Sequence, residues 1–151
     1  MTRPILLNSC AMAATAEEAR FRIDRPIGGR SALVVALDDG AAEVVDRLAE
    51  KPWQGARFVR ATDVALSDSG LAEELADADV AIMIATAKAD ANAASAIAQA
   101  CARRGIMTAG LILGERSDVG AAVTALRPYA RNLMVTGDED DIAEVLTALR
   151  A

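Results

Sequence analysis

The sequence contains no histidine, few aromatic residues and only two cysteines, and these shortages narrow what the protein can do. Without histidine, Ser-His-Asp and Cys-His nucleophilic systems and His-ligated metal sites are excluded. Cys10 and Cys101 stand in no CxxC or other metal-ligand spacing. Two isolated thiols are typical of a reducing cytoplasm, although a disulfide between them is left open. We therefore predict no catalytic residues and no metal site.

Positive charge and long apolar runs are also scarce. The 151 residues carry a net charge of −6, which opposes binding to nucleic acid or to an anionic membrane, since both require a concentrated basic surface. The apolar run Ile5–Leu7 is shorter than a secretory h-region of about 7–15 residues or a spanning helix of about 20. We expect a cytoplasmic protein with no nucleic-acid or membrane partner.

The residues that are abundant predict alternating strands and helices. Hydrophobic residues make up 53% of the chain, and from residue 32 onward short apolar runs alternate with amphipathic segments. The expected strands are Ala32–Leu37, Ala56–Ala61, Asp79–Ala85, Met107–Leu113 and Arg131–Thr136. The first, third and fourth runs are almost continuously apolar, which predicts central strands covered on both faces.

Five amphipathic segments between and after these strands predict helices. They are Ala41–Glu50, Leu71–Ala76, Ala91–Arg104, Asp118–Leu126 and Asp140–Leu149. Gly105 is expected to form a left-handed C-cap, and Ser69, Ser117 and Asp138 are the expected N-caps. The sequence thus predicts a three-layer, Rossmann-like α/β fold with a mostly parallel sheet of about five strands. We expect a single domain over residues 1–151, in which residues 1–30 form an irregular or helical N-terminal segment.

The loops that follow the strands are where a ligand site is expected, because open parallel sheets bind ligands outside the carboxyl ends of their strands. They contain neither a G-x-G-x-x-G nor a P-loop pattern. Lys88 and Arg116 are the only cations in the loops after the third and fourth strands, a position that points to a bound anion. The favoured alternative is that both are solvated surface charges on long side chains. The predicted ligand-binding residues are Asp38, Asp39, Thr86, Lys88, Asp90, Gly114, Arg116 and Ser117.

Two adjacent carboxylates, Asp38 and Asp39, follow the first strand and could together hold a magnesium ion. That pattern supports a hypothesis of a metal-dependent hydrolase. The favoured alternative is that Asp39 is the N-cap of the next helix and Asp38 a solvated neighbour. Cys101 and Trp53 are interpreted as packing residues, because no base is present to activate the thiol and the indole follows a proline in a loop.

The order of segments resembles the nucleotide-binding domain of the tubulin and FtsZ family. The likeness lies in Ser31–Asp63, Asp77–Ala85, Ala98–Leu113 and Leu126–Thr136. It implies a Rossmann-like nucleotide-binding scaffold. Where the family has phosphate-binding glycine loops, this chain has Leu37–Gly40 and Thr86–Asn92, so the family's GTP-binding residues are not carried over. A sugar-phosphate-binding sheet domain is similar to Asp79–Leu113 to about the same degree.

Three functional hypotheses follow from these observations. The first is a non-catalytic domain that binds a small anionic ligand or regulates a partner on a degenerate nucleotide-binding scaffold, with no cofactor specified. The second is a protein–protein interaction module, as a homodimer, in which the alanine-rich helix Ala91–Arg104 packs against its partner through small side chains. The third and weakest is the metal-dependent hydrolase that uses Asp38 and Asp39.

Overall fold

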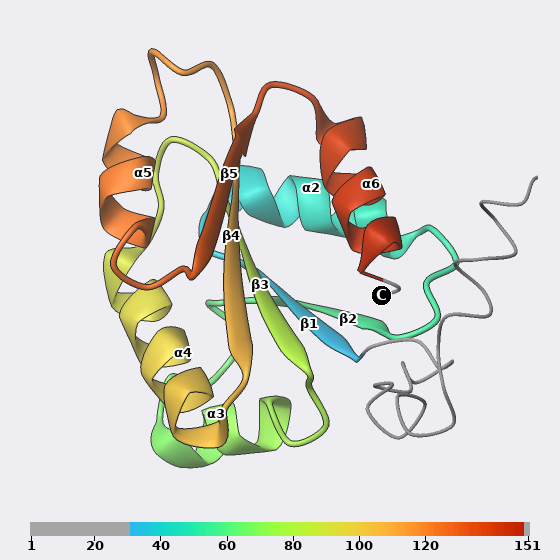
Figure 1. Cartoon of the computed structure of the whole chain (residues 1–151), viewed down its shortest axis with the longest axis vertical. Coiled ribbons are helices and arrows are strands. Elements are labelled where there is room, and N and C mark those ends of the chain that lie inside the picture. The colour runs from blue at the N-terminus through green and yellow to red at the C-terminus, as the bar shows by residue number, and fades with distance from the viewer. Residues whose placement is uncertain (1–30, 150–151) are drawn as a thin grey trace, which may run out of the picture.

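The computed structural model describes residues 31–149, which form a five-stranded parallel sheet with helices on both faces (Figure 1). The strands are β1 (Ala32–Ala36), β2 (Ala56–Arg60), β3 (Val80–Ala85), β4 (Met107–Leu113) and β5 (Asn132–Thr136). The helices are α2 (Asp39–Ala49), α3 (Asp68–Glu74), α4 (Ala91–Arg104), α5 (Gly120–Leu126) and α6 (Glu139–Ala148). The predicted N-terminal segment, residues 1–30, lies outside the described residues.

The strands lie in the order β2-β1-β3-β4-β5, and every neighbouring pair is parallel. The prediction that the first, third and fourth strands are central is confirmed. All residues of β1 and β3 are buried because both faces of these strands are covered. The chain order reverses between β1 and β3, and a crevice for a ligand is expected where their carboxyl ends diverge.

Two layers of helices enclose the sheet, and the predicted three-layer α/β fold is confirmed (Figure 1). On one face, α2 and α6 bury Leu48, Ile142 and Leu146 in one apolar cluster with residues of β1, β3 and β4. On the other face α3, α4 and α5 form the second apolar cluster, in which Ile97 of α4 lies with Met83 of β3. No helix within residues 31–149 is long and apolar enough to cross a membrane.

Two of the predicted N-caps are wrong. Helix α3 begins after Ser67 rather than Ser69, and the Ser67 hydroxyl accepts a hydrogen bond from the Gly70 amide at 3.3 Å. Helix α5 begins after Val119, which makes no side-chain cap, so Ser117 lies two residues outside the expected position. Burial of the Val119 side chain in the core takes precedence here over capping by a nearby hydroxyl.

Two other predicted caps, Asp138 and Gly105, agree with the structure. Asp138 caps α6 by accepting a hydrogen bond from the Asp140 amide at 2.9 Å. Gly105 ends α4 with a φ of 67°, the left-handed conformation that glycine adopts without steric cost. Strand β4 and helix α4 have the predicted bounds, because Gly105 separates the two elements in the sequence.

Candidate functional site at the carboxyl ends of β1 and β3

A crevice of about 500 Å³ opens at the carboxyl ends of β1 and β3, where the strand order reverses. Four predicted ligand-binding residues line it, Asp38, Asp39, Thr86 and Lys88. The other four lining residues, Leu37, Gly40, Thr62 and Ala87, were not predicted. The volume lies within the range of about 300–1,000 Å³ that is typical of small-molecule sites. The crevice is therefore the candidate site of this domain.

The carboxylate of Asp38 joins the ends of β1 and β3. Its Oδ1 accepts hydrogen bonds from the Ala41 amide at 2.8 Å and from the Thr86 hydroxyl at 2.7 Å. Its Oδ2 accepts a third from the Thr86 amide at 2.7 Å. The bond to Ala41 makes Asp38 the N-cap of α2, and the two bonds to Thr86 tie this helix to the end of β3.

The close approach of Thr86 explains the glycine in the first turn of α2. A Cβ atom at Gly40 would lie 2.8 Å from the Thr86 Oγ1 and 3.0 Å from its Cγ2. The threonine cannot rotate away without breaking its hydrogen bond to Asp38. Gly40 therefore makes room for a side chain of the same protein, and the space above it is already filled.

This geometry corrects the expected roles of the two acidic residues. The prediction that Asp39 is the N-cap and Asp38 a solvated neighbour is wrong, because the half-buried Asp38 caps α2 while Asp39 is exposed in its first turn. Both oxygens of Asp38 already accept hydrogen bonds within the protein. Over residues 31–149, no group of three or more carboxylate or thiol side chains is arranged to hold a metal ion.

Besides the exposed Asp39, the groups left to meet a ligand come from the loops after β2 and β3. Lys88 is exposed on the crevice and takes part in none of the salt bridges formed between residues 31 and 149. The Thr62 side chain is exposed beside it and makes no hydrogen bond within the same part of the chain. Thr62 was overlooked as a site residue, although its position directly after β2 is the signal that could have found it.

The other predicted site residues do not line the crevice. Asp90 is the N-cap of α4, where its Oδ1 accepts hydrogen bonds from the Asn92 amide at 2.9 Å and the Ala93 amide at 3.2 Å. Gly114 has a φ of 154°, and a Cβ there would lie 2.6 Å from the Val119 Cγ1. Gly114 therefore allows the chain to turn closely past Val119 after β4.

Arg116 and Ser117 follow Gly114 in the same turn and are both exposed. The Ser117 hydroxyl lies 3.2 Å from the Asp118 Oδ1, with which it is hydrogen bonded. Since neither residue is part of the crevice lining, the structure does not bring the loop after β4 together with Lys88.

Two residues interpreted as packing groups have that role. Cys101 is completely buried in the cluster beneath α4, and this burial raises the pKa of its thiol to about 11. The Trp53 ring is half-buried, its centroid lies 6.1 Å from that of Phe58, and its Nε1 donates a hydrogen bond to the Leu48 carbonyl at 2.6 Å. The buried, protonated thiol of Cys101 is a poor nucleophile.

Comparison with known proteins yields no family: no protein-family model and no curated protein matches the chain. A de novo designed PLOOP2X3_50 fold protein, solved by solution NMR, aligns with 80% of this chain and 90% of its own, at 17% identity and a TM-score of 0.46. A yeast Spc42 trimeric coiled-coil segment fused to another protein aligns with 81% of this chain and 79% of its own, at 14% identity and a TM-score of 0.46.

Proposed function

We propose that this domain binds a small polar molecule, without catalysis, in the crevice between the carboxyl ends of β1 and β3. The observation that carries the proposal is the crevice itself, placed where the strand order reverses and bordered by the hydroxyl of Thr62 and the ammonium of Lys88, which forms no salt bridge with any described residue. On this proposal the domain is a degenerate nucleotide-binding scaffold, and its resemblance to the tubulin and FtsZ family stays a prediction.

The charges around the crevice define the class of ligand. Asp38 and Asp39 contribute two carboxylates and Lys88 one ammonium, so the lining carries a net negative charge. A polyphosphate would be repelled, and the glycine that could have cradled it is packed beneath Thr86. A ligand with a single anionic group for Lys88 and hydroxyl or amino donors for Asp39 matches the lining. Nucleoside monophosphates, sugar monophosphates and hydroxy or amino acids have this chemistry.

The proposal does not include catalysis, because none of the described crevice residues pairs a free nucleophile with a base that would activate it. Asp38 is the half-buried carboxylate, and it is held by three hydrogen bonds. Asp39 is exposed, and among residues 31–149 the Thr86 hydroxyl donates to Asp38 while the Thr62 hydroxyl has no hydrogen-bond partner. A hydroxyl that donates to a fixed capping carboxylate is a structural group rather than an activated nucleophile.

A thermal-shift screen of the ligand classes named above, with nucleoside triphosphates and acyl-coenzyme A included for contrast, tests the proposal. A ligand present at about one hundred times its Kd stabilises the folded state by about 2.7 kcal/mol, which raises the Tm by several degrees. We expect at least one compound with a single anionic group to do this and the triphosphates not to.

The Lys88→Ala variant should abolish the shift that such a compound produces. Lys51→Ala is the matched control, because Lys51 is the other lysine of the sequence and is exposed beyond the far end of α2. If no compound raises the Tm, or if the two variants respond alike, the crevice is not a ligand site.

Dimerisation through α4 is not part of this proposal. The small side chains that suggested a helix partner, among them Ala93, Ala94 and Ala100, are buried against the domain's own sheet. The exposed positions of the helix include Gln99 and Arg103. A polar outer face supplies little apolar area for a stable homodimer.

A further inference from the structure

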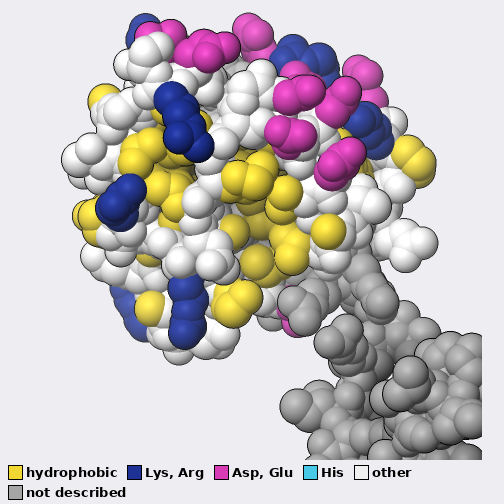
Figure 2. Space-filling view, turned by 45° about the horizontal axis from the view of Figure 1, so that its top comes forward, with side chains coloured by type: hydrophobic (Ala, Val, Ile, Leu, Met, Phe, Trp, Pro, Cys, Tyr) yellow, Lys and Arg dark blue, Asp and Glu magenta, His cyan; other side chains and the backbone are white. Residues whose placement is uncertain are grey.

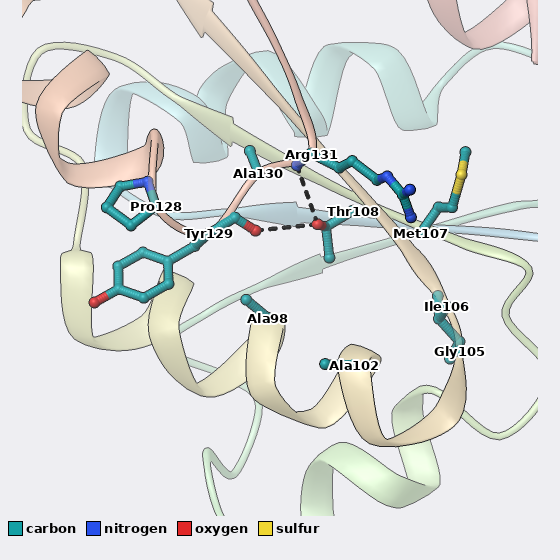
Figure 3. A pocket seen from close by; sticks show the side chains of 10 residues that line it. All are labelled: Ala98, Ala102, Gly105, Ile106, Met107, Thr108, Pro128, Tyr129, Ala130 and Arg131. Carbon is teal, nitrogen blue, oxygen red and sulfur yellow. Dashed lines mark hydrogen bonds between the residues drawn. The ribbon is translucent and has the colours of Figure 1, made fainter.

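A second groove, of about 410 Å³, lies near the amino ends of β4 and β5, away from the proposed crevice (Figure 3). One wall is the last part of α4, and the other is the segment that joins α5 to β5. The residues that matter for its chemistry are Ala98, Ala102, Met107, Pro128, Tyr129 and Arg131.

The groove exists because one wall is built from small side chains and the other is held in place. Ala98 and Ala102 are one helical turn apart on α4 and leave space above the helix (Figure 3). The Thr108 hydroxyl donates to the Tyr129 carbonyl at 3.0 Å, and the Arg131 amide donates to the Thr108 carbonyl at 3.1 Å. These bonds attach the α5–β5 segment to β4, so the groove is preformed.

The two ends of the groove differ in chemistry. Tyr129 and Pro128 stand at one end, while Arg131 extends over the strand toward Met107 at the other (Figure 3). Met107 is 44% exposed, which makes it one of the few large apolar side chains in residues 31–149 that are open to solvent. A ligand with a flat apolar body would cover the exposed side chain of Met107, and a negatively charged group on that ligand would lie beside the guanidinium of Arg131.

The local charge is opposite to that of the whole protein. Residues 91–114 and 126–136, which supply both walls, contain four arginines and no aspartate or glutamate in a chain whose net charge is −6. Arg103 is paired with Asp68, whereas Arg131 forms no salt bridge with any residue of the described range 31–149. Figure 2 shows the acidic side chains gathered over the upper part of the molecule, with lysine and arginine side chains among them and also along the left and lower edge.

We propose that this groove binds a small organic anion with a flat apolar body, of which an aromatic carboxylate is the simplest form. The guanidinium of Arg131 pairs with the carboxylate, since its planar donors match two carboxylate oxygens at once. The body lies between the alanines of α4 and the ring of Tyr129, with Met107 beneath the end that carries the charge. The site is independent of the β1–β3 crevice.

A pair of probes with the same body and opposite charge tests this directly. 2-Naphthoate and 2-naphthylmethylammonium are titrated separately into the full ¹⁵N-labelled chain, and backbone amide shifts are followed. We expect 2-naphthoate to move the amides of Ala98, Ala102 and Tyr129 with a Kd on the order of 1 mM, as expected for a body of this size. The ammonium compound should leave these amides in place.

Variants then separate the charge from the shape of the groove. Arg131→Ala should weaken 2-naphthoate about tenfold or more, because it removes a charge-assisted pair. Arg127→Ala is the matched control, since it removes the same charge from the same segment but from a residue outside the lining. Ala102→Phe, at an exposed helix position, should block the groove without disturbing the core.

Three results would overturn the proposal. They are equal shifts with the two probes, equal affinity of the wild type and Arg131→Ala, or no shift at the three amides up to about ten times the expected Kd. The Lys88→Ala variant should bind 2-naphthoate like the wild type. This distinguishes failure of the groove from failure of the proposed crevice, which is tested with different ligands.

Discussion

Replacing Asp38 by alanine should destabilise the domain far more than the loss of an ordinary helix cap. In the wild type, the carboxylate caps α2 through the Ala41 amide and also accepts two hydrogen bonds from Thr86, at 2.7 Å each. Asp90 provides a natural comparison, because it caps α4, the helix after β3, but its hydrogen bonds within residues 31–149 come from the first turn of its own helix alone. Asp38→Ala removes a cap and a link between strands, whereas Asp90→Ala removes only a cap.

The magnitudes follow from these contacts. Loss of an aspartate N-cap costs about 1 kcal/mol. A donor left unsatisfied in a buried place costs about 1–3 kcal/mol, and the lower value applies to the Thr86 amide and hydroxyl because Thr86 is half-buried at a crevice that water can enter. The expected loss is therefore about 3 kcal/mol for Asp38→Ala and about 1 kcal/mol for Asp90→Ala.

Urea unfolding measures both losses in stability. It is monitored by far-ultraviolet circular dichroism and by the fluorescence of Trp53, the single tryptophan of the sequence. With a slope of about 1–3 kcal/mol per molar urea, the two variants should differ in midpoint by about 1 M. Asp38→Asn should fall between them, because its amide nitrogen would place a donor against the Thr86 amide. If Asp38→Ala is no less stable than Asp90→Ala, the link from β1 to β3 contributes nothing and the structural role given to Asp38 is refuted.

Three further predictions concern other contacts. Gly40→Ala should lower the stability of the wild type, because the new Cβ would lie 2.8 Å from the Thr86 Oγ1. In a Thr86→Ala background it should raise the stability by up to about 1 kcal/mol, because only the higher helix propensity of alanine remains. Urea midpoints of the wild type, the two single variants and the double variant decide the sign. Burial raises the pKa of Cys101 from 9.0 to about 11, so the thiol ionises at lower pH in the unfolded chain than in the folded one. The wild type should therefore lose stability relative to Cys101→Ala as the pH rises from 9.0 to about 11. Unfolding curves measured below pH 9.0 should not show this difference. Arg47→Ala should leave the urea midpoint nearly unchanged at high salt, because its pair with Glu139 at 2.8 Å is solvent-exposed; a large loss there would contradict this.

The candidate site was only partly predictable, and the reason is the order of the strands. Position after a strand identified the right loops for Thr86 and Lys88, but it gave equal weight to Arg116 and Ser117 in the loop after β4. Nothing in the sequence pattern states that β3 lies beside β1, so the pattern could not select the loops that face the crevice. The exchange of roles between Asp38 and Asp39 is of the same kind, because Thr86 lies 48 residues away in the chain.

The sequence by itself determined the kind of fold and the burial of its central strands. The nearly continuous apolar runs are those of β1, β3 and β4, and such a run is expected to be covered on both sides. β1 and β3 are buried throughout, whereas β4 is buried over Gly110–Ile112 and begins with the exposed Met107. Local chemistry also fixed the end of α4, since Gly105 alone accounts for the left-handed cap. Such features depend on neighbouring residues only.

Tertiary structure decided which polar groups meet one another. The order β2-β1-β3-β4-β5 sets the reversal between β1 and β3, the hydrogen bonds between Asp38 and Thr86, and the position of Lys88 at the crevice. It also places the α5–β5 segment against β4, so that Arg131 stands over a groove beside α4. These contacts join residues that are distant in sequence, and their partners are chosen by the packing of the sheet rather than by any local preference.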